Sequence, residues 1–344
     1  MSRTLEKAMP ALFMAGALLL LGWYNVGKPS ILVLHSYDPG YAWVRDINAG
    51  LQRRFDRKYL YTVRWYYMDT KRHPSPAFKD SAGTAARNMV AATRPDVVIA
   101  IDDDAQQYVA RHFVGDPRIT IVFAGVNRQA ADYGYAGAAN VTGILERIPL
   151  AAMREALLSA PSLAAPGRAP RVAYLGDRSE TVDGDVAQVL RHDWAPVQLG
   201  RVRQVDTWPD WQAAVSALSA GHDVLLVSGY RGLRRSPTDP RLVPASEVVA
   251  WTEEHARVPV ISFNGFFTED GGMLAIGTSP YEQGEQAAAL ALQVALGRRP
   301  AARLPVQTSR QFTVSMRGAR MQARGFVLPR VYEAAARTGD QYLP

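Results

Sequence analysis

The chain reads Ile-Leu-Val-Leu-His-Ser-Tyr-Asp-Pro-Gly-Tyr-Ala-Trp-Val-Arg-Asp at residues 31–46. The unbroken apolar run at 31–34 predicts a short strand that is buried on both faces, as in a parallel sheet. The polar segment that follows contains Asp-Pro-Gly at 38–40, which indicates a turn. After it, apolar residues recur every four positions, as in an amphipathic helix: Trp43, Ile47, Leu51 and Phe55. In open α/β sheets ligands bind beyond the carboxyl ends of strands, so this loop is the first candidate site.

Strand-like and helix-like segments alternate through the rest of the chain, which predicts parallel sheets with crossover helices. The first series has strands at 62–69, 96–102 and 119–125 and helices at 77–93 and 104–114, and a short strand at 141–145 would suit a crossing between lobes. After a helix at 150–160 and a Pro/Ala-rich linker at 161–170, the second series has strands at 171–176, 197–205, 223–229 and 258–264 and helices at 181–192, 208–220 and 246–256. A strand at 273–278, a helix at 281–296, an extended segment at 304–316 and a short helix after residue 330 complete the prediction.

Two α/β series of similar length suggest two related lobes. The segment 116–125 resembles 255–265 in pattern, and each contains the last strand of its series. We therefore predict an α/β fold with two Rossmann-like lobes whose parallel sheets are joined by a multi-strand hinge. The predicted division is residues 1–28 as an N-terminal signal or membrane anchor, 29–145 plus 279–310 as lobe 1, and 146–278 plus 311–344 as lobe 2. Hinged lobes of this kind can close on a ligand.

The N-terminus resembles an export segment. Arg3 and Lys7 precede an uncharged run from Met9 to Tyr24 that is rich in Ala and Leu. The run has about the minimum length of a membrane span, which favours a cleaved signal peptide. The lack of an Ala-x-Ala cleavage site and the aromatic pair that ends the run favour an uncleaved anchor at residues 9–24, which is our preferred interpretation. A buried helix of the folded domain is the remaining alternative.

Composition excludes several classes of function. The chain has no cysteine, so disulfides, thiolate catalysis and cysteine-bound metals are excluded. Its net charge of +7 comes from arginines that are spread along the sequence, which is not the clustered patch of a nucleic-acid-binding protein. Phosphate loops, dinucleotide-binding fingerprints and nucleophile elbows are absent from the sequence, and the six histidines form no zinc-binding pair. We expect no cofactor, no metal and no nucleic-acid partner.

Polar residues follow most of the predicted strands, where they would face one cleft if the sheets are parallel. These candidate ligand-binding residues are Ser36, Tyr37, Asp102, Asp103, Asp104, Gly125, Asn127, Asp177, Ser228, Tyr230, Asn264 and Gly265.

The run Asp102-Asp103-Asp104 has two interpretations. Crowded carboxylates can hold an ammonium group or Mg²⁺, and we favour the ammonium group. Alternatively, Asp103 or Asp104 caps the helix that follows, whose first N–H groups need an acceptor. We expect one of the two to cap the helix and at least one other to contact a ligand.

Several segments together resemble a known family. They are Leu-His-Ser-Tyr-Asp-Pro-Gly-Tyr-Ala-Trp at 34–43, Val-Phe-Ala-Gly-Val-Asn at 122–127, Asn-Val-Thr-Gly at 140–143 and the stretch 258–284. This set is similar to the substrate-binding proteins of ABC transporters, in the TrpX-like group. The resemblance implies a type I periplasmic-binding-protein fold, a small ligand that is often an amino acid, and an inner-membrane permease as partner. The chain departs from the group in lacking a lipid-attachment cysteine and in having Val314-Ser315-Met316 where Val-Asn is expected.

The leading hypothesis is therefore an extracytoplasmic, periplasmic solute-binding protein that is not an enzyme. Ser36 and Tyr37 would contact the ligand from lobe 1, and the Asp102–Asp104 run would take a cationic group. Ser228, Tyr230 and Asn264 would close from lobe 2. One alternative is a ligand-sensing periplasmic subunit that signals to a membrane kinase or cyclase, because related modules serve as sensors. Another is a hydrolase or lyase that uses Ser228 or the aspartates.

Overall fold

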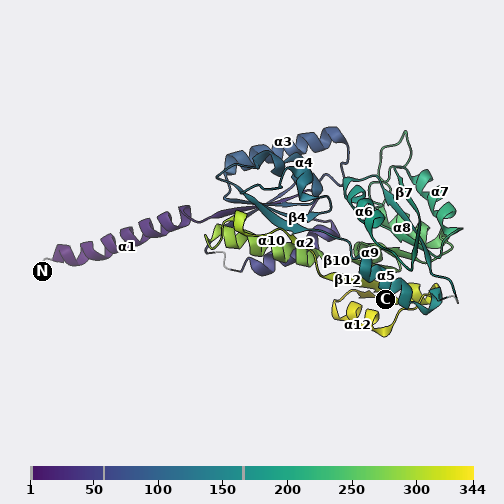
Figure 1. The fold of residues 1–344 in the computed structure, drawn as a ribbon. Helices are drawn as coiled ribbons and strands as arrows, with labels where there is room; N and C mark the ends of the chain where they lie inside the picture. Colours follow the sequence, from purple (N-terminus) through teal and green to yellow (C-terminus); the bar gives the residue numbers. More distant parts are fainter. Residues whose placement is uncertain (1–2, 57–58, 165–166) are drawn as a thin grey trace.

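The computed structural model describes residues 3–56, 59–164 and 167–344. Two mostly parallel sheets with helices on their faces form two lobes that lie side by side (Figure 1). The sheet of lobe 1 has the strand order β11-β5-β4-β3-β1-β2. Its strands are β1 (Ser30–His35), β2 (Thr62–Tyr67), β3 (Val97–Ile101), β4 (Thr120–Val126), β5 (Val141–Leu145) and β11 (Gln307–Thr308).

The sheet of lobe 2 has the order β13-β12-β10-β9-β8-β6-β7, in which β12 runs antiparallel to β10. Its strands are β6 (Arg171–Asp177), β7 (Gln198–Val205), β8 (Val224–Val227), β9 (Val260–Ser262), β10 (Leu274–Thr278), β12 (Phe312–Arg317) and β13 (Tyr342–Leu343). The order β2-β1-β3-β4-β5 in lobe 1 corresponds strand for strand to β7-β6-β8-β9-β10 in lobe 2. The predicted α/β fold class is confirmed. The two similar segments become β4 and β9, which occupy equivalent places. Each is followed by a further strand of its sheet, so neither is the last of its series.

The helices are α1 (Arg3–Val26), α2 (Ala42–Arg54), α3 (Pro76–Thr93), α4 (Asp103–Tyr108), α5 (Leu150–Ser159), α6 (Glu180–Arg191), α7 (Trp208–Ser219), α8 (Ala245–His255), α9 (Phe266–Glu269), α10 (Pro280–Ala295), α11 (Gly318–Ala323) and α12 (Arg330–Thr338). The helix predicted at 104–114 is instead α4 followed by a separate 3₁₀ turn at Ala110–Phe113. The linker predicted at 161–170 includes residues 165 and 166, which lie outside the described residues.

The central strands are apolar throughout because each is covered on both faces. Along β1, Ile31 and Val33 join the core beneath α2 and α10, whereas Leu32 and Leu34 join the core beneath α3 and α4. Successive side chains of a strand point to opposite faces, so an unbroken apolar run supplies both cores. The first core continues into lobe 2 through aromatic side chains between the lobes.

Helices α2 and α10 cross in close contact on lobe 1, although they lie more than two hundred residues apart in the chain (Figure 1). Two glycines make this approach possible. A Cβ atom at Gly50 would lie 2.2 Å from the carbonyl oxygen of Tyr281, and one at Gly284 would lie 2.1 Å from that of Ile47. The backbones therefore pack directly against each other.

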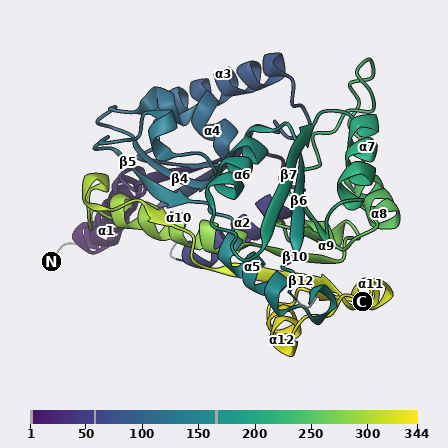
Figure 2. The same ribbon diagram turned by 45° about the vertical axis from the view of Figure 1, so that its right-hand side comes forward.

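The chain passes between the lobes three times, after β5, after β10 and after β11. Hydrogen bonds join these three passages. The Arg147 backbone N–H donates to Ser309 Oγ (2.9 Å), and Thr278 Oγ1 donates to the Arg147 carbonyl oxygen (3.1 Å). The Glu282 carboxylate accepts from the backbone N–H groups of Arg310 and Gln311. The hinge is thus a single hydrogen-bonded unit. Beside it, α6 of lobe 2 faces α4 of lobe 1 (Figure 2).

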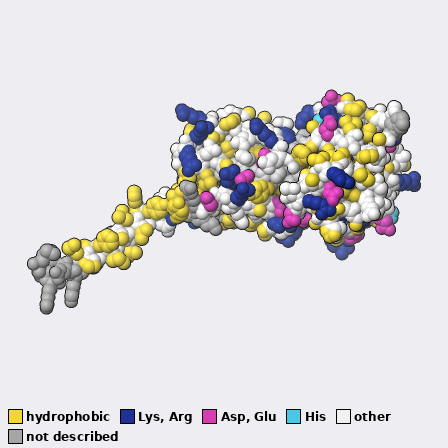
Figure 3. All heavy atoms as spheres, turned by 90° about the horizontal axis from the view of Figure 1, so that it is seen from below, with side chains coloured by type: hydrophobic (Ala, Val, Ile, Leu, Met, Phe, Trp, Pro, Cys, Tyr) yellow, Lys and Arg dark blue, Asp and Glu magenta, His cyan; other side chains and the backbone are white. Residues whose placement is uncertain are grey.

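Helix α1 projects away from the lobes, and hydrophobic side chains cover its visible surface (Figures 1 and 3). Leu12, Phe13, Leu19 and Trp23 are each at least 71% exposed, so the segment is not a buried helix of the folded domain. No helix within residues 3–56, 59–164 and 167–344 is long and apolar enough to cross a membrane.

Candidate functional site

The candidate site is the cleft between the two lobes, where the carboxyl ends of β1 and β3 face those of β6 and β8. Side chains from both lobes fill most of this cleft and leave two cavities with volumes of about 30 and 20 Å³. Lys71 and Thr181 line both cavities. The other lining residues come from loops and helices of both lobes: Tyr37, Tyr41, Thr70, Pro74, Lys79, Asp103, Asp104, Ser179, Glu180, Val182, Gly229, Tyr230, Arg231, Gly232, Asn264 and Phe266.

Ser36 has a structural position at the edge of the cleft. Its hydroxyl donates to the Ile101 carbonyl oxygen (2.7 Å) and accepts from the Ala105 backbone N–H (2.8 Å). Ser36 thus accepts a hydrogen bond from the first turn of α4. Neither Asp103 nor Asp104 caps that helix. The predicted capping role of those aspartates is wrong, because the Ala105 N–H of the first turn donates to Ser36, which follows the neighbouring strand β1.

Asp102 is the aspartate in the most constrained position. Its backbone has φ 66° and ψ 165°, a region that favours glycine. Its Oδ1 accepts from Trp43 Nε1 (2.8 Å), while its buried Oδ2 has no hydrogen-bond partner among the described residues. Gly125 follows the neighbouring strand and makes room for Asp102, since a Cβ there would lie 2.8 Å from Oδ1. Asp102 thus combines backbone strain with a free buried acceptor, although it lines neither cleft cavity.

Asp103 and Asp104 both line the larger cleft cavity but have different partners. Asp103 accepts from the Tyr133 hydroxyl (2.6 Å) and from the Asn127 backbone N–H (3.2 Å), so its charge is held within lobe 1. Asp104 forms an ion pair with Lys79 (2.9 Å). The Asn127 side chain donates to Glu146 (3.2 Å), and its Oδ1 is buried without a partner in the described part of the chain.

The lobe 2 candidates divide into internal and cleft-lining residues. Asp177 accepts from Ser179 and from the Gly232 backbone N–H (2.8 Å), which shapes the loops around it. Ser228 is fully buried and donates to Asp185, on α6. Neither Asp177 nor Ser228 lines a cleft cavity.

Tyr230 and Asn264 line the smaller cleft cavity, and the Tyr230 hydroxyl donates to Asp270 (2.6 Å). Arg231 also forms an ion pair with Asp270 (2.5 Å). Gly265 does not line either cleft cavity; it lines a different one, outside the cleft.

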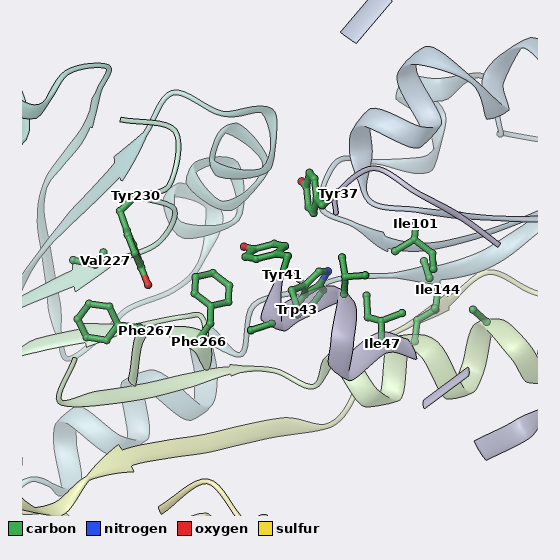
Figure 4. Close-up of a cluster of buried hydrophobic side chains, with 14 of the residues drawn as sticks. Tyr37, Tyr41, Trp43, Ile47, Ile101, Ile144, Val227, Tyr230, Phe266 and Phe267 are labelled. Carbon is green, nitrogen blue, oxygen red and sulfur yellow. The ribbon is translucent and has the colours of Figure 1, made fainter. Parts of the chain in front are cut away.

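Aromatic side chains connect the lobes (Figure 4). Tyr41 of lobe 1 lies 5.4 Å from Phe266 of lobe 2, measured between ring centroids, and Tyr37 lies 5.5 Å from Tyr41. Figure 4 shows Tyr41 between Tyr37 and Trp43 on one side and Phe266 and Tyr230 on the other. The guanidinium of Arg231 lies 5.1 Å from the Tyr41 ring centroid. The cleft therefore combines apolar walls with charged groups.

Polar and backbone contacts also join the two lobes. The Tyr37 and Thr181 hydroxyls are hydrogen-bonded (3.0 Å), and Arg45 on α2 forms an ion pair with Glu269 on α9 (2.9 Å). Gly184 on α6 faces Asn127 so closely that a Cβ would lie 2.7 Å from the Asn127 Cβ. The described arrangement is thus a closed one.

Comparison with solved structures identifies this architecture. The chain is similar to a conserved domain protein from Vibrio cholerae O1 biovar eltor (18% identity, 90% of this chain and 98% of that chain, TM-score 0.65). It is similar to the ABC domain in complex with L-Trp from Streptococcus pneumonia (16% identity, 89% of this chain and 98% of that chain, TM-score 0.64). It is also similar to the ligand-free, open structure of a substrate-binding protein with adhesive properties from Clostridium difficile (16% identity, 88% of this chain and 96% of that chain, TM-score 0.61).

The chain has the type I periplasmic-binding-protein fold. No protein-family model and no curated protein matches the sequence, so the fold is established by structural likeness.

In this type I periplasmic-binding-protein fold, the cleft carries an excess of buried carboxyl groups. Burial and neighbouring carboxylates raise the pKa values of Asp102 and Glu146 well above their usual range. Burial raises the pKa of Asp185 to about 7, and burial with repulsion from Asp104 raises that of Glu180 to about 7 as well. The cleft is therefore suited to a cationic group, which would stabilise the ionised carboxylates. No group of three or more His, Cys, Asp or Glu side chains in the described part of the chain is arranged to hold a metal ion.

Thermal stability should fall as the pH rises from 5 to 8, in part because of Glu180. Its pKa rises from 4.5 to about 7 on folding, so the folded protein retains a proton that the unfolded chain releases. Its contribution is greatest below pH 4.5 and is lost as the pH rises through 7. Glu180→Gln should make the unfolding midpoint less dependent on pH, whereas Glu155→Gln, at a carboxylate that is 63% exposed, should not. Equal pH dependence in Glu180→Gln and the unmodified chain would contradict this assignment.

Sequence reasoning missed many residues that line the cavities from loops and helix starts, among them Lys71, Glu180, Thr181 and Arg231. None of them directly follows a strand in the apolar pattern, and basic residues are common throughout the chain. The only signal for Lys71 was its place shortly after the predicted strand 62–69, which is too general to single it out.

Proposed function

We propose that this protein is an extracytoplasmic solute-binding protein that captures an amino acid or related metabolite between its lobes and delivers it to an ABC transporter permease. The observation that carries the proposal is the cleft, which lies between two hinged lobes and is lined by aromatic rings, cations and carboxylates from both. The complex of one structural neighbour with L-Trp supports the amino-acid class. Closure without catalysis would suffice for this role, so we propose no enzymatic activity.

The ligand would have to enter while the lobes are apart. The two cleft cavities, about 30 and 20 Å³, have room for only one or two water molecules each, because a water needs about 10–15 Å³. We propose that the moving bodies are residues 29–145 plus 279–310 and residues 146–278 plus 311–344. The open, ligand-free form of one neighbour supports such a movement in this fold.

We assign opposite ends of the ligand to different groups. The buried acceptors Asp102 Oδ2 and Asp185 Oδ1, which have no partner in the described part of the chain, line neither cleft cavity of the closed arrangement; in the open form they would offer lobes 1 and 2 an acceptor each for an ammonium group. Lys71 suits a carboxylate, because it lines both cavities and its ammonium, 5.1 Å from the Tyr37 ring centroid, forms no salt bridge with the described residues. Tyr37, Tyr41 and Phe266 would surround the ligand's apolar part.

A thermal-shift screen with the twenty amino acids and small metabolites tests the proposal. A ligand at a hundredfold excess over its Kd should raise the unfolding midpoint by about 5 °C. Lys71→Met should then weaken binding of the amino acid identified by the screen by about tenfold to a hundredfold, since one charge-assisted hydrogen bond is lost. Lys28→Met, outside the cleft, is the matched control. No stabilisation by any compound would contradict the proposal.

We further propose that the protein works on the periplasmic side of the inner membrane, with residues 9–24 acting as an export signal or membrane attachment. The exposed apolar surface of α1 supports this role. N-terminal sequencing of protein from fractionated cells would distinguish cleavage from retention. Co-purification with a membrane kinase or cyclase instead of a permease would favour the sensing alternative.

A further inference from the structure

An apolar cavity that borders both lobes lies outside the cleft, beside the hinge. Its volume is about 470 Å³, within the range of about 300–1,000 Å³ that is usual for small-molecule sites. It is lined by α2, α9, the start of α10, β12 and the segment after α12. The lining residues are Ala42, Trp43, Asp46, Ala49, Gly265, Phe266, Glu269, Thr278, Ser279, Pro280, Tyr281, Phe312, Thr313, Val314, Ala335, Gly339 and Gln341.

The cavity combines aromatic walls with two carboxylates. Trp43, Phe266, Tyr281 and Phe312 supply rings, and Phe312 is 47% exposed. The charged lining residues are Asp46 and Glu269, both acidic. Arg45 forms an ion pair with each of them (2.9 Å), so one guanidinium is shared by two carboxylates.

Two further cations near the cavity lie outside the lining set: Arg53 donates to the Tyr281 hydroxyl (2.8 Å), and the Arg231 guanidinium lies 4.8 Å from the Phe266 ring centroid. The interior of the cavity therefore presents aromatic faces and carboxylate oxygens, and none of the described residues that line it is cationic. A ligand with an apolar ring and a positively charged end matches these groups.

We propose that this cavity is a second binding site, which takes a small aromatic amine and acts on the lobes from the hinge. The site does not depend on the solute-binding role, although its effect on closure does. Its walls belong to both lobes and to two of the three hinge passages, so separation of the lobes would change its shape. A ligand that fits the closed shape better shifts the lobes toward closure.

Two residues connect the second site with the cleft. Trp43 lines the cavity, and its Nε1 donates to Asp102 in the cleft. Phe266 lines both the hinge cavity and the smaller cleft cavity. A ligand in the hinge cavity would thus contact Trp43 and Phe266 from the side opposite the cleft ligand.

Calorimetric titration of the full chain with 2-phenylethylamine tests the proposal, with 3-phenylpropionate as the anionic counterpart of similar shape. The amine should bind saturably and about tenfold more tightly than the anion. Glu269→Gln should reduce this difference. Ala49→Trp, which places a large side chain in the cavity from α2, should weaken amine binding at least tenfold, whereas Ala85→Trp on the exposed face of α3 should leave it unchanged.

Thr181→Trp separates the two sites, because Thr181 lines only the cleft cavities among those described. Amine binding should persist in this variant even though binding of the cleft ligand is lost. Loss of amine binding in Thr181→Trp but not in Ala49→Trp would assign the amine to the cleft and overturn the second site while leaving the solute-binding role intact. Absence of saturable amine binding to the unmodified chain would overturn it as well. Circular dichroism should show that each variant is folded.

Discussion

Replacing Gly184 with leucine should hold the lobes apart and weaken binding of the cleft ligand by about a hundredfold. A Cβ at this position would lie 2.7 Å from the Asn127 Cβ and 3.1 Å from the Asn127 carbonyl carbon. These are atoms at the backbone of the opposite lobe, which cannot swing aside as the end of a side chain can. In the open form the same leucine would be a better helix former than glycine, so the variant should remain folded.

Small-angle scattering and calorimetry would check this result. Gly184→Leu should keep a larger radius of gyration than the unmodified chain, and the ligand identified by thermal shift should not reduce it. Ala187→Leu, on the same helix, adds similar bulk and should bind as the unmodified chain does. If Gly184→Leu became compact and bound with unchanged affinity, the closed contact between α6 and lobe 1 would not be required for binding.

Replacing Gly284 with alanine should destabilise lobe 1 by about 3 kcal/mol. Alanine is normally the better residue inside a helix by about 1 kcal/mol, so the expected sign is reversed. The reason is the α2–α10 crossing, where the added Cβ would lie 2.1 Å from the Ile47 carbonyl oxygen and 2.9 Å from the Leu51 nitrogen. Both are backbone atoms, so the helices must move apart and lose packing along their whole contact.

Urea unfolding followed by circular dichroism would measure the loss. Gly22→Ala provides the matched control, because Gly22 is also helical and a Cβ there meets nothing within 4 Å. It should leave the unfolding of the lobes unchanged. A midpoint for Gly284→Ala equal to or above that of the unmodified chain would show that α2 and α10 are not in direct backbone contact.

The sequence alone determined the lobes and the edge of each sheet where a site could lie. Unbroken apolar runs such as 31–34 identify strands buried on both faces, and the polar residues after them must emerge at the carboxyl ends of parallel strands. This reasoning placed Tyr37, Asp103, Asp104, Tyr230 and Asn264 in the cleft lining. Local patterns suffice here because burial and strand direction are properties of short segments.

Only the tertiary structure decided which polar groups are free to meet a ligand. Ser36 and Asp177 follow strands as Tyr37 does, yet their polar atoms are engaged by neighbouring loops and helices. Lys71 and Thr181 lie more than a hundred residues apart and belong to different lobes, yet they line the same two cavities. The hydrogen-bond partner of a side chain depends on contacts between distant segments, and no periodicity within one segment contains that information.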